Sequence, residues 1–110
     1  MTNPETEFEV IKDASGKTLG FSLIAGAQTE GEDFVGSFPK ALRNKKADIK
    51  FEGNEIVFVN PDAIFPGRCA HKLDQTDLVS LQDLLASENK LKIEKAGFFT
   101  PGFKIVKMEQ

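Results

Sequence analysis

The stretch Asp-Ile-Lys-Phe-Glu-Gly-Asn-Glu-Ile-Val-Phe-Val, residues 48–59, decides the fold class, because its whole length is typical of a β-hairpin. Apolar and charged residues alternate before Gly53-Asn54, and β-branched and aromatic residues follow. A two-residue turn containing glycine between two such runs is a hairpin signal. Pairing across this turn forms two apolar pairs on one face, Phe51 with Ile56 and Ile49 with Phe58. The hairpin therefore has an apolar face that must pack on the rest of the chain.

Two more hairpins flank this one. Residues 6–12 alternate in polarity, residues 13–17 are rich in turn formers, and alternation resumes over residues 19–25. Near the other end, residues 90–94 and 103–105 alternate on either side of the loop Ala96–Gly102. The pattern predicts three antiparallel hairpins.

A helix is predicted from about Asp74 to Ser87. Asp74 is a favourable N-cap, and Asp77 occupies the third helical position of an approximate capping box. A leucine stripe at helical spacing marks the core-facing side, Leu78, Leu81, Leu84 and Leu85. Elsewhere the sequence predicts a loop over residues 26–36, a short helix over 37–46 and an irregular segment over 60–72.

These elements predict an α+β fold. We expect a mostly antiparallel sheet of about six strands in three hairpins, with the helix at about 74–87 packed on it. A partly closed barrel is the alternative arrangement. Residues 1–110 are expected to form a single domain, with residues 1–5 as a flexible N-terminus.

Composition limits the function classes. The formal net charge is −3 and the isoelectric point is about 5.2, which gives no general attraction to nucleic acid or anionic membranes. The only cysteine, Cys69, cannot form an intramolecular disulfide. The sequence shows neither a signal peptide nor an apolar run of the roughly 20 residues that cross a bilayer. We therefore expect a cytoplasmic protein without membrane contact and without a cofactor.

Cys69 and His71 are the first candidate site. Two residues apart, they would share a face if this segment were a strand. Cysteine and histidine can form a nucleophile and its base, but no third group is evident. Only Asp74 and Asp77 lie nearby, which is not a common metal-binding pattern, so no metal site is predicted. A simpler interpretation is a packed cysteine and a surface histidine.

The densest basic segment spans residues 40–46. Its four cations could contact phosphates from one face of a short helix: Lys40, Arg43, Lys45 and Lys46. Solvated cations near a helix C-terminus are the alternative interpretation, because they interact favourably with the helix dipole.

The Phe-rich loop 96–103 is the third candidate site. Phe98 and Phe99 are adjacent, and Phe103 follows a Pro-Gly pair. Aromatic residues in loops either anchor the loop on the core or form a surface for a partner.

Together these features favour a small non-enzymatic binding or assembly module that acts through protein–protein contacts. Its surface would be the Phe-rich loop 96–103 or a sheet edge, and self-association as a homodimer is one form of this function. Nucleic-acid or phosphate binding through residues 40–46 is the first alternative. A small enzyme that uses Cys69 and His71 is the second.

Overall fold

A computed structural model describes residues 6–25, 30–61, 67–87, 90–97 and 100–108. Its described residues form seven strands and two helices: β1 (Thr6–Lys12), β2 (Thr18–Ala25), α1 (Glu30–Arg43), β3 (Asp48–Glu52), β4 (Glu55–Val59), β5 (Arg68–Lys72), α2 (Gln75–Leu85), β6 (Leu91–Lys95) and β7 (Gly102–Lys107). The strands make two antiparallel sheets, one in the order β1-β2-β7-β6 and one in the order β3-β4-β5. The fold is therefore α+β, as predicted.

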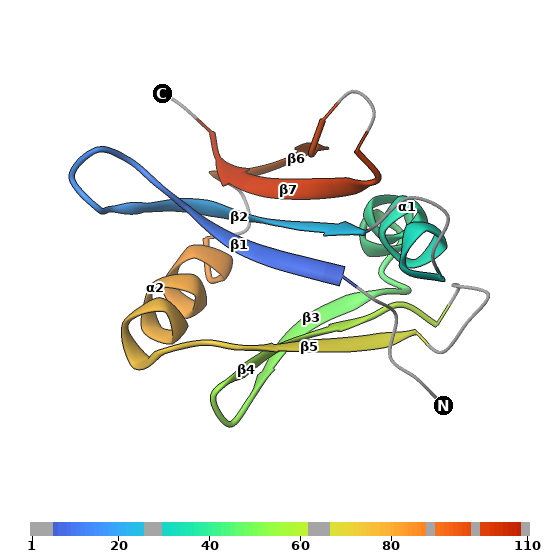
Figure 1. The fold of residues 1–110 in the computed structure, drawn as a ribbon, viewed down its shortest axis with the longest axis horizontal. Helices are drawn as coiled ribbons and strands as arrows, with labels where there is room; N and C mark the ends of the chain where they lie inside the picture. Colours follow the sequence, from blue (N-terminus) through green and yellow to red (C-terminus); the bar gives the residue numbers. More distant parts are fainter. Residues whose placement is uncertain (1–5, 26–29, 62–66, 88–89, 98–99, 109–110) are drawn as a thin grey trace.

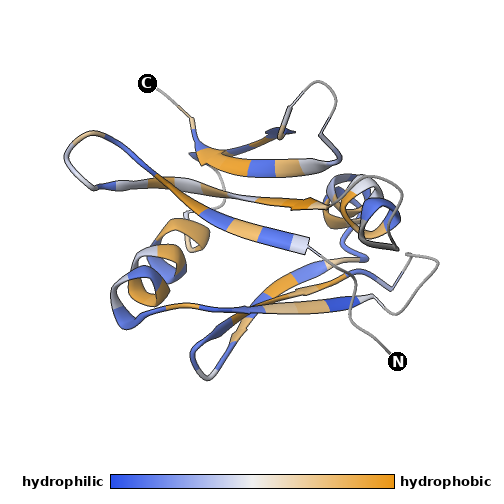
Figure 2. Cartoon of the chain, in the orientation of Figure 1, coloured by the Kyte–Doolittle hydropathy of each residue, from blue (hydrophilic) through white to orange (hydrophobic). Residues whose placement is uncertain are grey.

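The two sheets lie one above the other, with a helix at each end of the space between them (Figure 1). Hydrophilic and hydrophobic residues alternate along β1 and β7 (Figure 2). Each sheet turns one apolar face inward, and the helices cover the ends of that interior.

Phe58 of β4 lies at the centre of the interior. It is fully buried, and its ring is 5.9 Å from that of Phe21 and 5.7 Å from that of Phe38. Phe38 in turn stacks on Phe103 with ring centroids 5.0 Å apart. A single cluster of buried side chains includes residues from both sheets and both helices. Aromatic packing of this kind holds the layers together.

The three predicted hairpins are confirmed, and so is the register predicted for the central one. Phe8 pairs with Leu23, Phe51 with Ile56 and Ile49 with Phe58. The third hairpin is formed by β6 and β7. In α2, the Asp74 side chain accepts a hydrogen bond from the Asp77 amide at 2.7 Å, so the predicted N-cap is also present.

Two segments differ from the sequence prediction. The predicted loop 26–36 and short helix 37–46 are instead the single helix α1, which begins at Glu30. Phe34 and Phe38 pack one turn apart on its buried side, and this packing outweighs the low helix propensity of Gly36 and Pro39. The irregular segment predicted over 60–72 contains β5, whose pairing with β4 gives a third strand to the central hairpin.

The described strands form two open sheets and no closed barrel. Residues 1–5, which were predicted to be a flexible N-terminus, lie outside the described residues. Phe98 and Phe99 of the Phe-rich loop lie outside them as well.

Candidate functional site

The two open sides of the layered sheets differ. On one side the edge strands β1 and β5 are bridged through Thr6. Its hydroxyl lies 2.8 Å from Nε2 of His71 and donates a hydrogen bond to Sγ of Cys69 at 3.5 Å. Phe8 stacks on the His71 ring with centroids 5.6 Å apart. Polar and aromatic contacts therefore join the two sheets along this side.

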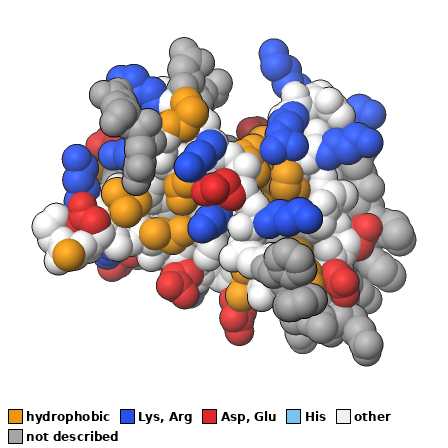
Figure 3. Space-filling view, turned by 90° about the horizontal axis from the view of Figure 1, so that it is seen from above, with side chains coloured by type: hydrophobic (Ala, Val, Ile, Leu, Met, Phe, Trp, Pro, Cys, Tyr) orange, Lys and Arg blue, Asp and Glu red, His pale blue; other side chains and the backbone are white. Residues whose placement is uncertain are grey.

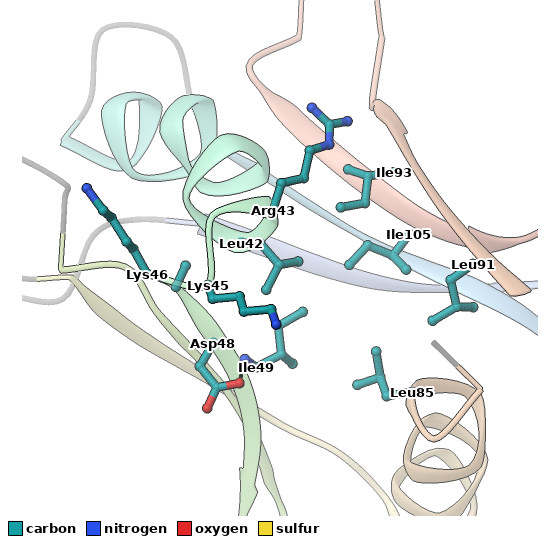
Figure 4. A pocket seen from close by; sticks show the side chains of 11 residues that line it. Leu42, Arg43, Lys45, Lys46, Asp48, Ile49, Leu85, Leu91, Ile93 and Ile105 are labelled. Atoms are coloured by element: carbon teal, nitrogen blue, oxygen red, sulfur yellow. Dashed lines mark hydrogen bonds between the residues drawn. The ribbon is translucent and has the colours of Figure 1, made fainter. Parts of the chain in front are cut away.

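The other side lies between the edge strands β6 and β3 and holds a cleft of about 680 Å³. No hydrogen bond or ion pair among the described residues joins these two strands. The side chains of α1, α2, β3, β6 and β7 converge on the cleft (Figure 4). We call this space the edge cleft. Its floor consists of aliphatic side chains: Leu42, Ile49, Leu85, Leu91, Ile93 and Ile105.

The floor residues are turned inward by strand register. Ile93 on β6 pairs with Ile105 on β7, and both lie on the inner face of the four-stranded sheet. Ile105 is 3% exposed, whereas Ile93 and Leu91 are only partly buried because no strand lies beyond β6. The cleft is thus the incompletely covered margin of the hydrophobic core.

Cations from the end of α1 stand on the rim of the edge cleft. Arg43 passes beside Ile93, and the Lys45 chain extends over Ile49, while the Lys46 ammonium points away (Figure 4). The Asp48 carboxylate also lies on the rim and accepts a hydrogen bond from the Ile49 amide at 2.9 Å. The site combines an aliphatic floor with a mainly basic rim.

A second hollow of about 570 Å³ continues from the first and shares Arg43 and Ile93 with it. One wall is the face of α1 that carries Gly36, Lys40 and Arg43, and the other is the β6–β7 hairpin. In Figure 3 a notch in the surface exposes hydrophobic atoms, with Lys and Arg side chains beside it. We call the edge cleft and this second hollow together the groove, and both are lined by residues of β6.

The structure brings the predicted basic residues to this groove. Lys40 and Arg43 lie in the last turn of α1, and Lys45 and Lys46 follow it directly. All four line one or both hollows. The sequence identified these cations but not the aliphatic floor. Alternation indicated an inward face for its strand residues, such as Ile49 and Ile93, but no local pattern shows that a strand lies at the edge of its sheet.

Cys69 and His71 share the inner face of β5, as expected for neighbours two residues apart on a strand. Cys69 is 2% exposed, and burial raises the pKa of its thiol. Burial also lowers the pKa of His71, while the Glu55 carboxylate acts in the opposite direction. An activated nucleophilic thiol needs a depressed pKa and access to substrate, and this one has neither. His71 is half-buried in the seam between the sheets, so the interpretation of a surface histidine was wrong.

Phe103 is 1% exposed and belongs to the core. Phe98 and Phe99, the other two aromatic candidates, lie outside the described residues. Within the described ranges, no three His, Cys, Asp or Glu side chains are grouped so that they could hold a metal ion. Neither described helix combines the length and apolarity needed to span a bilayer.

Comparison with known proteins gives no relative: no family model, no curated protein and no solved structure matches this chain.

Proposed function

We propose that the domain is a protein-binding module and that the edge cleft is its contact surface. The observation that carries the proposal is an asymmetry of the layered sheets. Thr6 joins β1 to β5 by hydrogen bonds, whereas no hydrogen bond or ion pair among the described residues joins β6 to β3 across the edge cleft. A recessed apolar surface with a polar rim resembles the core-and-rim organisation of protein interfaces.

The form of the groove supports a protein segment as the occupant. Two hollows are connected along β6 and remain open to solvent on one side. A linear segment can place successive side chains in such a groove, as peptides do in the grooves of other recognition domains.

Site-specific photo-crosslinking in the native host tests this proposal. A photoreactive side chain at Leu91, in the cleft, should give a discrete protein adduct. The matched control is Ile11, a partly buried aliphatic residue on the outer face of β1, where no adduct should form. An adduct with the mass of two copies of this chain would identify self-association. Equal labelling from both positions, or none from Leu91, would contradict the proposal.

Phosphate or nucleic-acid binding through Lys40, Arg43, Lys45 and Lys46 is a second candidate, supported by the clustering of these cations on one rim. It differs from protein binding in one respect, because phosphate contacts do not require the aliphatic floor. Oligonucleotide binding that survives Leu91→Asn but is lost in Arg43→Glu would favour it.

An enzyme based on Cys69 and His71 has the least support, because the thiol is buried and its pKa is raised.

A further inference from the structure

Lys45 has an unusual backbone conformation. Its φ is +61°, the left-handed region that glycine or asparagine normally occupies after a helix, because a β-carbon there is unfavourable. Hydrogen bonds that terminate α1 hold it in place. The Lys45 amide donates to the Leu42 carbonyl at 3.1 Å, and the Lys46 amide donates to the Ala41 carbonyl at 2.8 Å. Helix termination alone would be better served by glycine.

This conformation sends the Lys45 side chain over the apolar floor near Ile49 (Figure 4). Arg43 lies on the same rim, beside Ile93, so the two cations stand at different points along the cleft. Attraction to the helix dipole is a sufficient reason for a cation at Lys40 or Arg43. It does not explain a lysine at a position that favours glycine.

Three of the cations around this cleft, Lys40, Arg43 and Lys45, form no ion pair within the part of the chain that the structure describes, unlike several cations elsewhere in the fold. Lys12 pairs with Asp77 at 3.2 Å and Arg68 with Glu52 at 2.6 Å. A partner that covered the aliphatic floor would desolvate the rim, and unpaired cations there would then be costly. The partner must therefore bring negative charge.

We infer that the edge cleft binds an acidic, aliphatic segment of a partner protein. Its carboxylates pair with Arg43 and Lys45, and its aliphatic side chains pack on the partly exposed residues of the floor, Leu85, Leu91 and Ile93. The inference rests on the proposed function and adds the chemistry of the partner. Lys45 is the specificity-determining residue, retained despite its backbone cost because it carries one of the two charges.

Selection of a random peptide library on the immobilised domain tests the inference. The wild type should enrich peptides in which Asp or Glu flank Leu, Ile or Val. The double variant Arg43→Glu/Lys45→Glu should shift the selection toward Lys and Arg, because the sign of the rim is reversed. Leu91→Asn, checked for its fold by circular dichroism, should lose the peptides that the wild type selects.

A matched set of variants at position 45 separates the effect of the Lys45 charge on binding from the effect of its backbone conformation on stability. Lys45→Gly should raise the melting temperature and weaken binding of a selected acidic peptide roughly two- to fivefold, the range expected for one exposed ion pair. Lys45→Arg should retain the affinity, and Lys17→Gln, on the β1–β2 turn, should not change it. The loss caused by Lys45→Gly should shrink as salt is added.

The outcomes are distinguishable. Peptides that require Leu91 but show no acidic bias, or that bind Lys45→Gly as tightly as the wild type, would overturn the inference and leave the cleft as a protein-binding site. Selected peptides that are indifferent to Leu91, or a selection that enriches none, would overturn the proposed function as well.

Discussion

At the scale of single residues, Cys69 shows how burial suppresses thiol chemistry. The sulfur accepts a hydrogen bond from Thr6 and lies opposite Phe58 on the neighbouring strand. Burial raises the pKa of the thiol, so the thiolate is scarce at neutral pH. We expect the native protein to react with a neutral alkylating reagent far more slowly than the urea-unfolded chain. Mass spectrometry of timed samples measures both rates, and comparable rates would show that the thiol is accessible and reactive.

Protonation of His71, which lies between the two sheets, should make the stability of the fold depend on pH. Its pKa in the folded protein is lowered from an ordinary 6.5, mainly by burial, so the unfolded chain binds a proton more readily than the folded one. This difference destabilises the fold as pH falls below about 6.5, until the lowered pKa of the folded state is reached. The stability contributed by neutral His71 is fully present only above pH 6.5.

The corresponding measurement is the free energy of unfolding in urea between pH 7.5 and pH 5, both values being about one unit or more from the ordinary pKa of histidine. We expect stability to decrease toward pH 5 in the wild type. His71→Gln can still hydrogen-bond to Thr6 but does not titrate, so its stability should change less over this interval. Parallel curves for the two proteins would contradict this role of His71.

At the scale of elements, the hairpin of β3 and β4 shows what a local pattern can and cannot reveal. Alternation and the Gly53-Asn54 turn were sufficient to predict its register. They could not show that Phe58 would be fully buried while Phe51, on the same face, remains partly exposed. That difference arises because β4 is the central strand of its sheet and β3 is an edge strand.

The difference in burial between Phe58 and Phe51 predicts that replacing each ring by alanine lowers the free energy of unfolding by a different amount. Phe58→Ala removes a ring that packs against Phe8, Phe21, Phe38 and Phe103, and should cost about 3–5 kcal/mol. Phe51→Ala removes a partly exposed ring and should cost less than Phe58→Ala. Urea unfolding followed by circular dichroism measures both values. Equal losses would mean that β3 is as deeply buried as β4.

The sequence analysis did not predict two elements correctly, α1 and β5, and the reason is physical in each case. In α1, Phe34, Phe38 and Ala41 have helical spacing, but Gly31, Gly36 and Pro39 in the same segment are typical of loops. Strand β5 faces the interior with Cys69 and His71, which are not strongly apolar, so its alternation was weak. Its pairing with β4 depends on a neighbour that only the folded chain supplies.

At the scale of the whole molecule, the candidate site depends on strand order. The first hairpin meets the last through the pairing of β2 with β7, between residues far apart in sequence. This pairing makes β6 an edge and so exposes one margin of the core. The sequence could identify Arg43 and Lys45, because charge is local. It could not identify the edge cleft, because the cleft exists only once two separate sheets have assembled.

The asymmetry of the two sides leads to a prediction about local stability. All four edge strands, β1, β5, β6 and β3, have one hydrogen-bonded neighbour, so position in the sheet alone would give them similar protection from hydrogen exchange. Thr6 links β1 to β5 through Cys69 and His71, and the ion pair of Lys12 with Asp77 ties β1 to α2. Strands β6 and β3 have the edge cleft between them instead. Local opening at β6 and β3 therefore disrupts fewer interactions between the sheets.

We expect the hydrogen-bonded amides of β6 and β3 to exchange faster than those of β1 and β5 under native conditions, as measured by NMR. Replacing Thr6 by Val removes the hydroxyl that bridges the other side, so it should accelerate exchange in β1 and β5 and leave β6 and β3 nearly unchanged. A bound peptide should have the converse effect and protect β6 and β3 selectively, because it supplies the contacts that the fold lacks there. Equal exchange rates at all four edge strands would mean that β6 and β3 are as stable locally as β1 and β5. The edge cleft would then not be a region of low local stability that a bound peptide protects.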